Sequence, residues 1–198
     1  MDKLPIIVFA TGNKNKSREV ARLLEGKFLV KSLPEIGCTE DILETADTLE
    51  GNAALKARYV KNNYGFDCFA DDTGLEVVAL NGAPGVHTAR YGGPEKDAQT
   101  NMRHLLSELN QVKSTDRSAQ FRTAIHLIVN GKEVVIEGIC KGKIAEKQSG
   151  FEGFGYDPIF MPVGENRTFS EMSSDEKNKI SHRGLAIREM LEYLSSLH

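Results

Sequence analysis

The chain of 198 residues carries 25 Lys and Arg against 28 Asp and Glu, which gives a net charge of −3. That length fits one large domain or two closely joined lobes, and the charge argues against a general nucleic-acid-binding protein, which needs a basic surface. The three cysteines form no CxxC pair, and no apolar run is long enough for a signal peptide or a bilayer span, so we expect a cytoplasmic protein in a reducing compartment, without a disulfide framework or zinc site.

A strand, a glycine-containing turn and a helix are predicted at the start of the chain. Residues 6–10 form a continuous β-rich apolar run, typical of a strand covered on both faces. A helix is predicted from Ser17 to Glu25, with Gly26 just after it. The turn between them offers helix N-terminal N–H groups and lysines to an anion, although it is neither a Walker loop nor GxGxxG. The residues of this candidate phosphate site are Thr11, Gly12, Asn13, Lys14, Asn15 and Lys16. The alternative is a plain strand-to-helix turn that binds no anion.

A second helix is predicted from Asp47 to about Asn62, after a short strand at residues 28–30 and an acidic loop at residues 34–46. Asp47 fits an N-cap and Glu50 fits its partner in the first turn, so Glu50 has a structural explanation and Glu44 has none. Lys56 lies on the apolar face of this helix, which is costly unless the lysine meets an anion. The alternative is that its amine snorkels to the rim.

Two adjacent carboxylates, Asp71 and Asp72, follow an apolar run that includes Cys68. We predict a strand that ends in a turn at Thr73 and Gly74. Neighbouring carboxylates repel each other, and Mg²⁺, which takes carboxylate oxygens and keeps several waters, is a physical reason to place them together. Because side chains alternate along a strand, at most one of the two faces a given cleft. A solvated Asp-Asp turn is the alternative.

The second half of the chain predicts antiparallel sheet added to an α/β beginning. A helix is predicted near residues 95–109, after a loop rich in glycine and proline that we expect to be functional or to form an interface. Alternation over residues 121–129, the dipeptide Asn130-Gly131 and the return over residues 132–142 are typical of a β-hairpin. His126, on the less apolar side of that hairpin, is expected to be half exposed.

Glycines alternate with aromatic residues over residues 150–158, which lets the backbone bend while rings stand free to stack on a base. The alternative is an aromatic turn that fills the core. A short strand at residues 159–161 follows, and Ser173 or Ser174 is expected to cap a helix. His182 and Arg183 stand at the head of the last amphipathic helix, where they can donate hydrogen bonds to a ligand or form a surface cap.

Taken together, these motifs resemble the inosine/xanthosine triphosphate pyrophosphatase family, in that family's order and spacing and over nearly the whole chain. The resemblance rests on residues 11–16, 44–45, 52–57, 70–74, 82–85, 89–91, 153–158, 176–177 and 181–183. It implies an α/β fold with a long mixed β-sheet flanked by helices and two lobes around a central cleft, in a single domain over residues 1–198. It also implies a homodimer that uses Mg²⁺ to hydrolyse non-standard purine nucleoside triphosphates to monophosphate and pyrophosphate.

The resemblance further implies roles for individual residues. Residues 11–16 are expected to cradle the phosphates, and Lys56 is expected to help neutralise the triphosphate. Glu44 and Asp72 are expected to hold Mg²⁺, with Asp72 also accepting a proton from the attacking water. Thr73 is expected to touch the substrate. The residues expected to enclose the nucleoside are Phe154, Gly155, Tyr156, Asp157, Lys177, His182 and Arg183.

The expected base preference follows from hydrogen-bond donors. Arg183 can only donate, so it favours the 6-oxo group of inosine and xanthosine over the 6-amino group of adenosine. Guanine also has the 6-oxo group, and its rejection needs a further residue that the sequence does not identify. This chain departs from the family pattern at three positions near the site, where it has Ala46 in place of a common glycine, Gly51 in place of a frequent glutamate, and Thr73 in place of a frequent serine. The competing hypotheses are a non-catalytic purine nucleotide-binding regulatory module and a nucleic-acid-binding domain.

Overall fold

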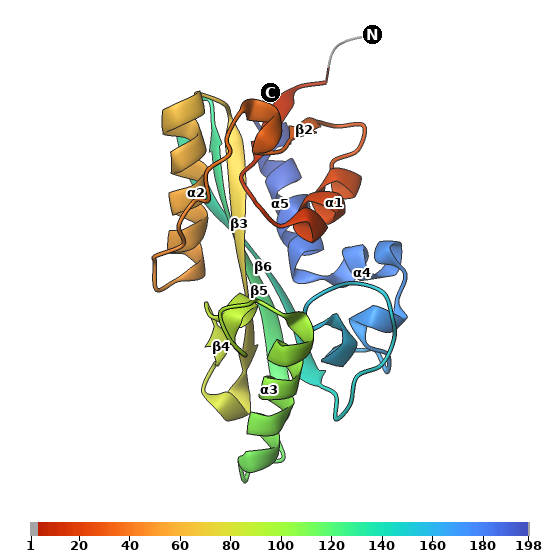
Figure 1. The fold of residues 1–198 in the computed structure, drawn as a ribbon. Coiled ribbons are helices and arrows are strands. Elements are labelled where there is room, and N and C mark those ends of the chain that lie inside the picture. The colour runs from red at the N-terminus through yellow and green to blue at the C-terminus, as the bar shows by residue number, and fades with distance from the viewer. Residues whose placement is uncertain (1–3, 198) are drawn as a thin grey trace. The chain divides into compact units, whose positions relative to one another are not determined.

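The computed structural model describes residues 4–197, which form a mixed β-sheet flanked by helices (Figure 1). Within these residues the sheet has seven strands, in the order β2-β1-β3-β5-β6-β7 with β4 paired to β3. β1 runs parallel to β2 and β3, whereas β4 is antiparallel to β3 and β7 is antiparallel to β6. The predicted mixed α/β fold is confirmed. The strands are β1 (Ile6–Phe9), β2 (Leu29–Lys31), β3 (Cys68–Val77), β4 (Pro84–Gly85), β5 (Ser118–Val129), β6 (Lys132–Ile144) and β7 (Phe160–Pro162).

The α-helices agree with the expected ones in place and differ in where they begin. Ser173 caps the fourth helix as predicted, and Glu176 returns the hydrogen bond in a capping box. No helix among the described residues has the length and apolar character that crossing a membrane requires. The helices are α1 (Lys14–Leu23), α2 (Leu49–Tyr64), α3 (Ala98–Gln111), α4 (Ser174–Ile180) and α5 (His182–Ser195).

The first two helices begin where short polar side chains satisfy their free N–H groups. α1 begins earlier than predicted because Oδ1 of Asn13 accepts two N–H groups of the first turn, at 2.9 and 3.2 Å. α2 begins after Thr48, whose Oγ1 accepts the N–H of Gly51 at 3.1 Å. The predicted N-cap at Asp47 is therefore wrong by one residue. The Thr48 hydroxyl caps the helix in place of the Asp47 carboxylate, which the spacing to Glu50 had indicated as the cap.

The chain divides into two compact units. The first comprises residues up to 72, residues 124–137 and residues from 186 onward, and the second comprises residues 73–123 and 138–185. Strands β3, β5 and β6 contribute residues to both units. Each unit has its own hydrophobic core.

In the first unit, helices cover the strands on both faces. Ile7, Phe9 and Phe69 pack with α1 and α5, whereas Val8 and Cys68 pack with α2. Figure 1 shows α2 on one side of β3 and α1 and α5 on the other. The side chains at positions 7–9, 68 and 69 are thus buried on one face or the other, which explains the continuous apolar sequence of these segments.

The core of the second unit is built around three aromatic rings. The ring centroid of Phe121 lies 4.7 Å from that of Phe160, which lies 5.1 Å from that of Phe169. Leu75 of β3 and Met102 of α3 belong to the same buried cluster. The C-terminal half of β3 is therefore a core strand of this unit.

The turn between β5 and β6 has the geometry that its sequence predicts. Asn130 has a φ of 50° and Gly131 a φ of 73°, as a two-residue hairpin turn requires. His126 on β5 is 4% exposed, so the expectation that it is half exposed is wrong. Its Nε2 lies 2.9 Å from Oε2 of Glu133, which also accepts hydrogen bonds from Arg58 of α2. Packing of α2 on this side of β5 accounts for the burial.

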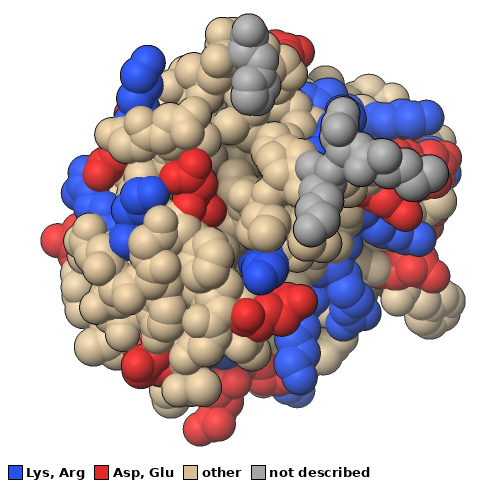
Figure 2. Space-filling model, turned by 90° about the horizontal axis from the view of Figure 1, so that it is seen from above, with Lys and Arg blue, Asp and Glu red and all other residues tan. Residues whose placement is uncertain are grey.

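Charged side chains of both signs are interspersed on the surface. On the face that Figure 2 shows, Lys and Arg lie among Asp and Glu around a largely uncharged centre. This arrangement agrees with the near balance of 25 basic and 28 acidic residues. Charges on this face are therefore mixed rather than sorted by sign.

The loop before α2 packs directly on a glycine of the helix. A Cβ added to Gly51 would stand 2.6 Å from Cβ of Ala46 and 3.0 Å from Oγ1 of Thr48. Ala46 is held in this place because its N–H donates to Oδ1 of Asn52 at 2.9 Å. Ala46 and Gly51, two of the positions where this chain departs from the family pattern, thus lie in direct contact.

A side chain at position 51 is expected to be tolerated only when position 46 loses its own. Gly51→Ala should destabilise the protein by about 1 kcal/mol, because overpacking exceeds the gain in helix propensity. Adding Ala46→Gly should recover most of that loss, with a favourable coupling of about 1 kcal/mol. Urea unfolding of the two single variants and the double variant measures this coupling. Additive costs of the two substitutions would contradict the contact.

Candidate active site

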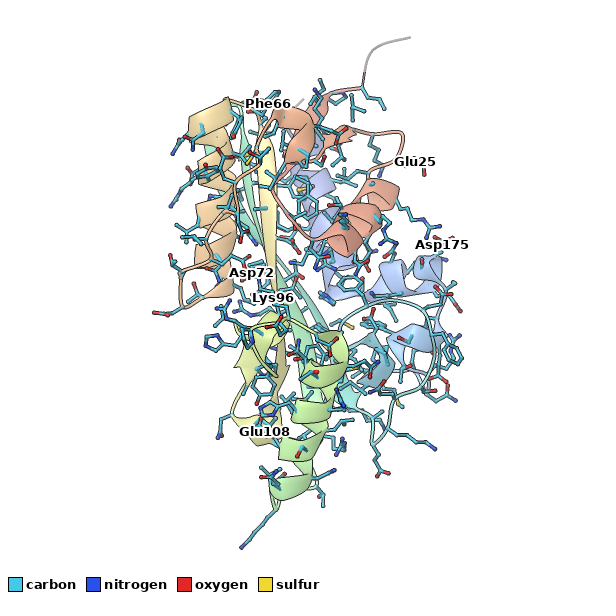
Figure 3. All side chains as sticks on the ribbon, in the orientation of Figure 1. Glu25, Phe66, Asp72, Lys96, Glu108 and Asp175 are labelled. Atoms are coloured by element: carbon cyan, nitrogen blue, oxygen red, sulfur yellow. The ribbon has the colours of Figure 1, made fainter. Side chains whose placement is uncertain are left out.

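Asp71 and Asp72 point to opposite faces of β3 because the strand continues through them. β3 runs from Cys68 to Val77, so the predicted turn at Thr73 and Gly74 is wrong. Asp72, labelled in Figure 3, faces α2 and accepts a hydrogen bond from Nδ2 of Asn52 at 3.1 Å. Asp71 faces α1, where Nζ of Lys16 lies 3.1 Å from its Oδ1. The alternation argument from the sequence thus separates the two carboxylates as expected.

Asp71 contacts two of the predicted phosphate-binding lysines. Its carboxylate pairs with Lys16, and its carbonyl oxygen accepts a hydrogen bond from Nζ of Lys56 at 2.8 Å. Lys56 also forms an ion pair with Glu44. Since Lys56 is 6% exposed, its amine does not snorkel to the surface. Lys16, Glu44 and Lys56 are therefore gathered around the strand segment that carries the two aspartates.

Asn52 is a residue of this site that the sequence analysis did not single out as functional. Its amide accepts the N–H of Ala46 and donates to Oδ2 of Asp72. It therefore ties the loop that follows Glu44 to the Asp72 carboxylate. A signal was present in the sequence, since Asn52 and Lys56 are spaced to lie on one face of the same helix.

Burial makes the protonated form of Asp72 more favourable than the protonated form of an ordinary, solvated aspartate. Burial raises the pKa of Asp72, and the nearby carboxylate of Glu44 adds to the increase. Lys16, Lys56 and the hydrogen bond from Asn52 act in the opposite direction. A divalent cation beside Asp72 and Glu44 would offset both effects that raise the pKa.

Glu44 and Asp72 are suitable ligands for a hard divalent cation. Mg²⁺ commonly takes one or two carboxylates and completes its shell with water and substrate phosphates. Among residues 4–197 no group of three or more His, Cys, Asp or Glu side chains is arranged to hold a metal ion. Glu44 and Asp72 could therefore hold such a cation only together with water or ligand oxygens.

The predicted phosphate-binding turn lies between β1 and α1. Oγ1 of Thr11 accepts the N–H of Asn13 at 3.2 Å, and the side chain of Asn13 occupies two N–H groups of the first helical turn. Gly12, Lys14 and Asn15 are exposed. An anion at this turn can therefore bind the exposed backbone of Gly12 and the Lys14 side chain directly. To bind the N–H groups of Asn15 and Lys16, it must compete with the side chain of Asn13, which caps the helix.

In the second unit, Asp157 organises the aromatic glycine-rich loop. Its Oδ2 accepts the N–H of Phe154 at 2.7 Å and a hydrogen bond from Nζ of Lys177 at 2.8 Å. Gly153 has a φ of 81°, and an added Cβ there would stand 2.2 Å from that same oxygen. The Lys177 ammonium also lies 4.9 Å from the centre of the Phe154 ring. Asp157, expected to enclose the nucleoside, thus fixes Phe154 and Lys177.

Arg183 and His182 are buried at the start of α5. Nη2 of Arg183 donates to Oγ1 of Thr73 at 3.0 Å, and its guanidinium carbon lies 5.8 Å from the centre of the Phe154 ring. The His182 ring stacks on Phe121 with centroids 4.5 Å apart. These contacts exclude the surface-cap alternative, because Arg183 is only 2% exposed.

Tyr156 belongs to the core. Its ring packs in the hydrophobic cluster of the second unit, and its hydroxyl donates to the carbonyl oxygen of Thr88 at 3.0 Å. Burial raises the pKa of the Tyr156 hydroxyl. The expectation of free rings is therefore wrong for Tyr156, which fills the core as the alternative described. The adjacent Gly155 has a φ of 63°, which favours glycine, and Phe154 is partly exposed.

The structure thus brings the predicted site residues into two groups, one in each unit. The first group contains residues 11–16, Glu44, Lys56 and Asp72, to which Asn52 and Asp71 are added. The second group contains Thr73, Phe154, Asp157, Lys177 and Arg183, with His182 packed on the adjoining core.

The chain is similar to known proteins over nearly its whole length. The sequence model of the Ham1 family matches residues 7–193. The dITP/XTP pyrophosphatase of Christiangramia forsetii is 53% identical over 189 residues, which cover 96% of this chain and 98% of that protein. The dITP/XTP pyrophosphatase of Bacillus subtilis is 44% identical and covers 96% of each chain. The structure of a HAM1 protein from Coxiella burnetii has a TM-score of 0.89 at 36% identity, covering 98% of this chain and 100% of that one.

The Asp72 carboxyl is expected to titrate above the ordinary aspartate value of about 3.9 in metal-free protein, because burial penalises its charged form. Adding Mg²⁺ should lower the midpoint, since a cation favours the carboxylate, and Glu44→Gln should weaken that response. Side-chain carbon NMR of metal-free and Mg²⁺-loaded protein measures both effects.

Asp116 is the control for this titration. It is exposed, and hydrogen bonds from Ser118 lower its pKa, so it should titrate below the ordinary value and should not respond to Mg²⁺. A midpoint for Asp72 that Mg²⁺ leaves unchanged would contradict the assignment of Glu44 and Asp72 as cation ligands.

Proposed function

The chain belongs to the Ham1 family, and we propose that it is an enzyme that hydrolyses non-standard purine nucleoside triphosphates, those of inosine, deoxyinosine and xanthosine. The products are the monophosphate and pyrophosphate. Relatives named dITP/XTP pyrophosphatase, similar to this chain over nearly their whole length, support this activity. Removing such nucleotides from the pool prevents their incorporation into DNA or RNA.

The observation that carries the proposal is the environment of Asp72. This half-buried carboxylate accepts a hydrogen bond from Asn52 on one oxygen, which orients it as a proton acceptor and suits a general base. We propose that one of its oxygens accepts the proton of the attacking water while Asn52 orients the other. Mg²⁺ held by Glu44 and Asp72 would supply Lewis acidity and lower the pKa of a bound water.

The lysines of the first unit supply positive charge for the triphosphate. Lys56 and Lys16 are fixed on Asp71 by its carbonyl and its carboxylate. Cationic groups that are already in place lower a barrier most where negative charge grows, which here is on the pyrophosphate leaving group. The exposed backbone of residues 11–16 is proposed to contact the same phosphates.

The second unit is proposed to bind the nucleoside. Phe154 offers an aromatic ring, and Arg183 and Lys177 offer donors beside it. Because Arg183 cannot accept a hydrogen bond, a 6-oxo purine satisfies it and a 6-amino purine leaves a buried donor unpaired. Thr73, held by Arg183, is proposed to contact the substrate directly.

We further propose a single domain over residues 1–198 that works as a cytoplasmic homodimer and has no stable nucleic-acid partner. The continuous family match over residues 7–193 supports one domain. The three buried free cysteines suit a reducing compartment. The net charge of −3 is unlike that of a nucleic-acid binder, which needs a basic surface. The alternative of a non-catalytic nucleotide-binding module is less favoured, because binding alone does not require a half-buried carboxylate oriented by an amide.

A substrate panel tests the reaction. Inosine, deoxyinosine and xanthosine triphosphates should release pyrophosphate in the presence of Mg²⁺ and much less without it, while adenosine and guanosine triphosphates should react poorly. Pyrophosphate and orthophosphate are measured separately. Orthophosphate as the first product would place the cleavage at another bond, and tight binding without any turnover would favour the regulatory module.

Asp72→Asn should lower kcat by about 10²–10⁴-fold, the usual contribution of a general base, and change substrate binding far less. Steady-state kinetics and calorimetric binding of inosine triphosphate separate the two effects. Asp116→Asn, a matched change at an exposed aspartate, should behave like the parent protein. Full activity of Asp72→Asn would reject Asp72 as the base.

Arg183→Ala should reduce the preference for inosine triphosphate over adenosine triphosphate by roughly tenfold or more, because hydrogen bonds to charged groups contribute about 1.5–3 kcal/mol. Arg183→Lys keeps the charge but lacks the planar fork, so it should recover little of the preference. The ratio of kcat/KM for the two substrates is the readout, with thermal unfolding to check folding. An unchanged ratio would contradict the role in base selection.

A further inference from the structure

Thr123 is a fully buried hydroxyl in contact with the proposed nucleoside site. It lies on β5 in the second unit and is 0% exposed. Its Oγ1 lies 2.7 Å from Oγ1 of Thr73, which accepts a hydrogen bond from Nη2 of Arg183 at 3.0 Å. Three residues from β3, β5 and α5 are thereby joined in one chain of hydrogen bonds. Nothing in the comparisons or in the sequence motifs assigns Thr123 a role.

Hydrogen-bond satisfaction determines the direction of this chain. Among the described residues, Thr73 is the hydrogen-bond partner of the Thr123 hydroxyl. If Thr73 donated to Thr123, the proton of the buried Thr123 hydroxyl would have no acceptor there, which is costly. Thr123 therefore donates to Thr73.

Thr73 then accepts from both of its neighbours. A hydroxyl oxygen accepts two hydrogen bonds and donates one. Arg183 and Thr123 both donate to the Thr73 oxygen. The Thr73 side chain is thus fixed in its rotamer by two hydrogen bonds.

We propose that Thr123 is a positioning residue for nucleotide binding, which acts through Thr73 and Arg183. It donates to Thr73, holds that side chain in place, and so keeps Arg183 aligned for a 6-oxo purine. This inference rests on the proposed function, because it assumes that Thr73 and Arg183 face the nucleotide. Arg183 is buried and donates a hydrogen bond to Thr73. A small movement of Thr73 would therefore change the direction in which the N–H groups of Arg183 point.

The substitution Thr123→Val keeps the side-chain shape and removes only the hydroxyl, whereas Thr123→Ser keeps the hydroxyl. Thr123→Val should raise KM for inosine triphosphate by about three- to tenfold, the range of one neutral hydrogen bond, and leave kcat nearly unchanged. The preference over adenosine triphosphate should fall by a similar factor. Thr123→Ser should restore the parent values. A purely structural hydroxyl would instead lower thermal stability without a change in the substrate ratio.

A second background tests whether Thr123 acts through Thr73. In Thr73→Ala protein, Thr123→Val should have no further effect on KM, because the hydroxyl that it positions is absent. An equal effect in both backgrounds would overturn the proposal. If Thr123→Val does not fold, Thr123→Ala removes the same hydroxyl and is measured in its place.

Binding of inosine monophosphate distinguishes this inference from the proposed reaction, because it needs no turnover. Calorimetry should show about three- to tenfold weaker binding for Thr123→Val and parent-like binding for Thr123→Ser. Parent protein that binds inosine monophosphate with this pattern but does not hydrolyse the triphosphate would overturn the proposed function and leave the inference standing. Unchanged binding in Thr123→Val, or no binding to the parent protein, would overturn the inference.

Discussion

The structure depends on the extended backbone of β3 at Asp71 and Asp72. A strand sends neighbouring side chains to opposite faces, so one carboxylate meets Lys16 of α1 and the other meets Asn52 of α2. A slip of one residue would exchange the two aspartates and every core residue of the strand. The apolar side chains that fix the register of β3 between the two helix layers therefore also decide which carboxylate lies beside Asn52, in the position of the proposed base. Packing of the core and placement of the two carboxylates thus depend on the same register.

Buried charges in both units are stabilised by the same device, a lysine held on a backbone or carboxylate oxygen. Lys56 meets Glu44 and a carbonyl, and Lys177 meets Asp157. Removing one partner of such a pair is far more costly than the pair's net contribution to stability. These contacts orient the ammonium groups before any phosphate arrives, so less side-chain freedom is lost on binding. The ligand then competes with internal carboxylates for the same donors, which favours substrates with high negative charge.

Local signals predicted much of the fold. The Asn130-Gly131 turn and the Ser173 cap depend on neighbours in the chain, and both are found where the sequence indicates. Thr73 and Gly74 look like a turn, yet pairing of β3 with β4 and β5 keeps them extended. Contacts between residues far apart in the chain decided the burial of His126 and Tyr156 and the hydrogen-bond partners of Asn52 and Thr123. Periodicity places Asn52 on the same helix face as Lys56, but it does not identify the partners of Asn52. The resemblance to a family identified Asp72 and Glu44 as candidate site residues. It did not identify Asn52, whose side-chain amide joins the loop after Glu44 to Asp72.

The contact between Ala46 and the bare Cα of Gly51 also bears on how this site can change over generations. A side chain at position 51 has no room while Ala46 is present, because the two Cβ atoms would stand 2.6 Å apart. Replacing the loop alanine first and the helix glycine second avoids this overpacking, whereas the reverse order passes through a variant that is less stable by about 1 kcal/mol. Each position constrains the history of the other, although neither contacts a nucleotide under the proposed function. The loop after Glu44 and the first turn of α2 are thus expected to be inherited as a matched pair.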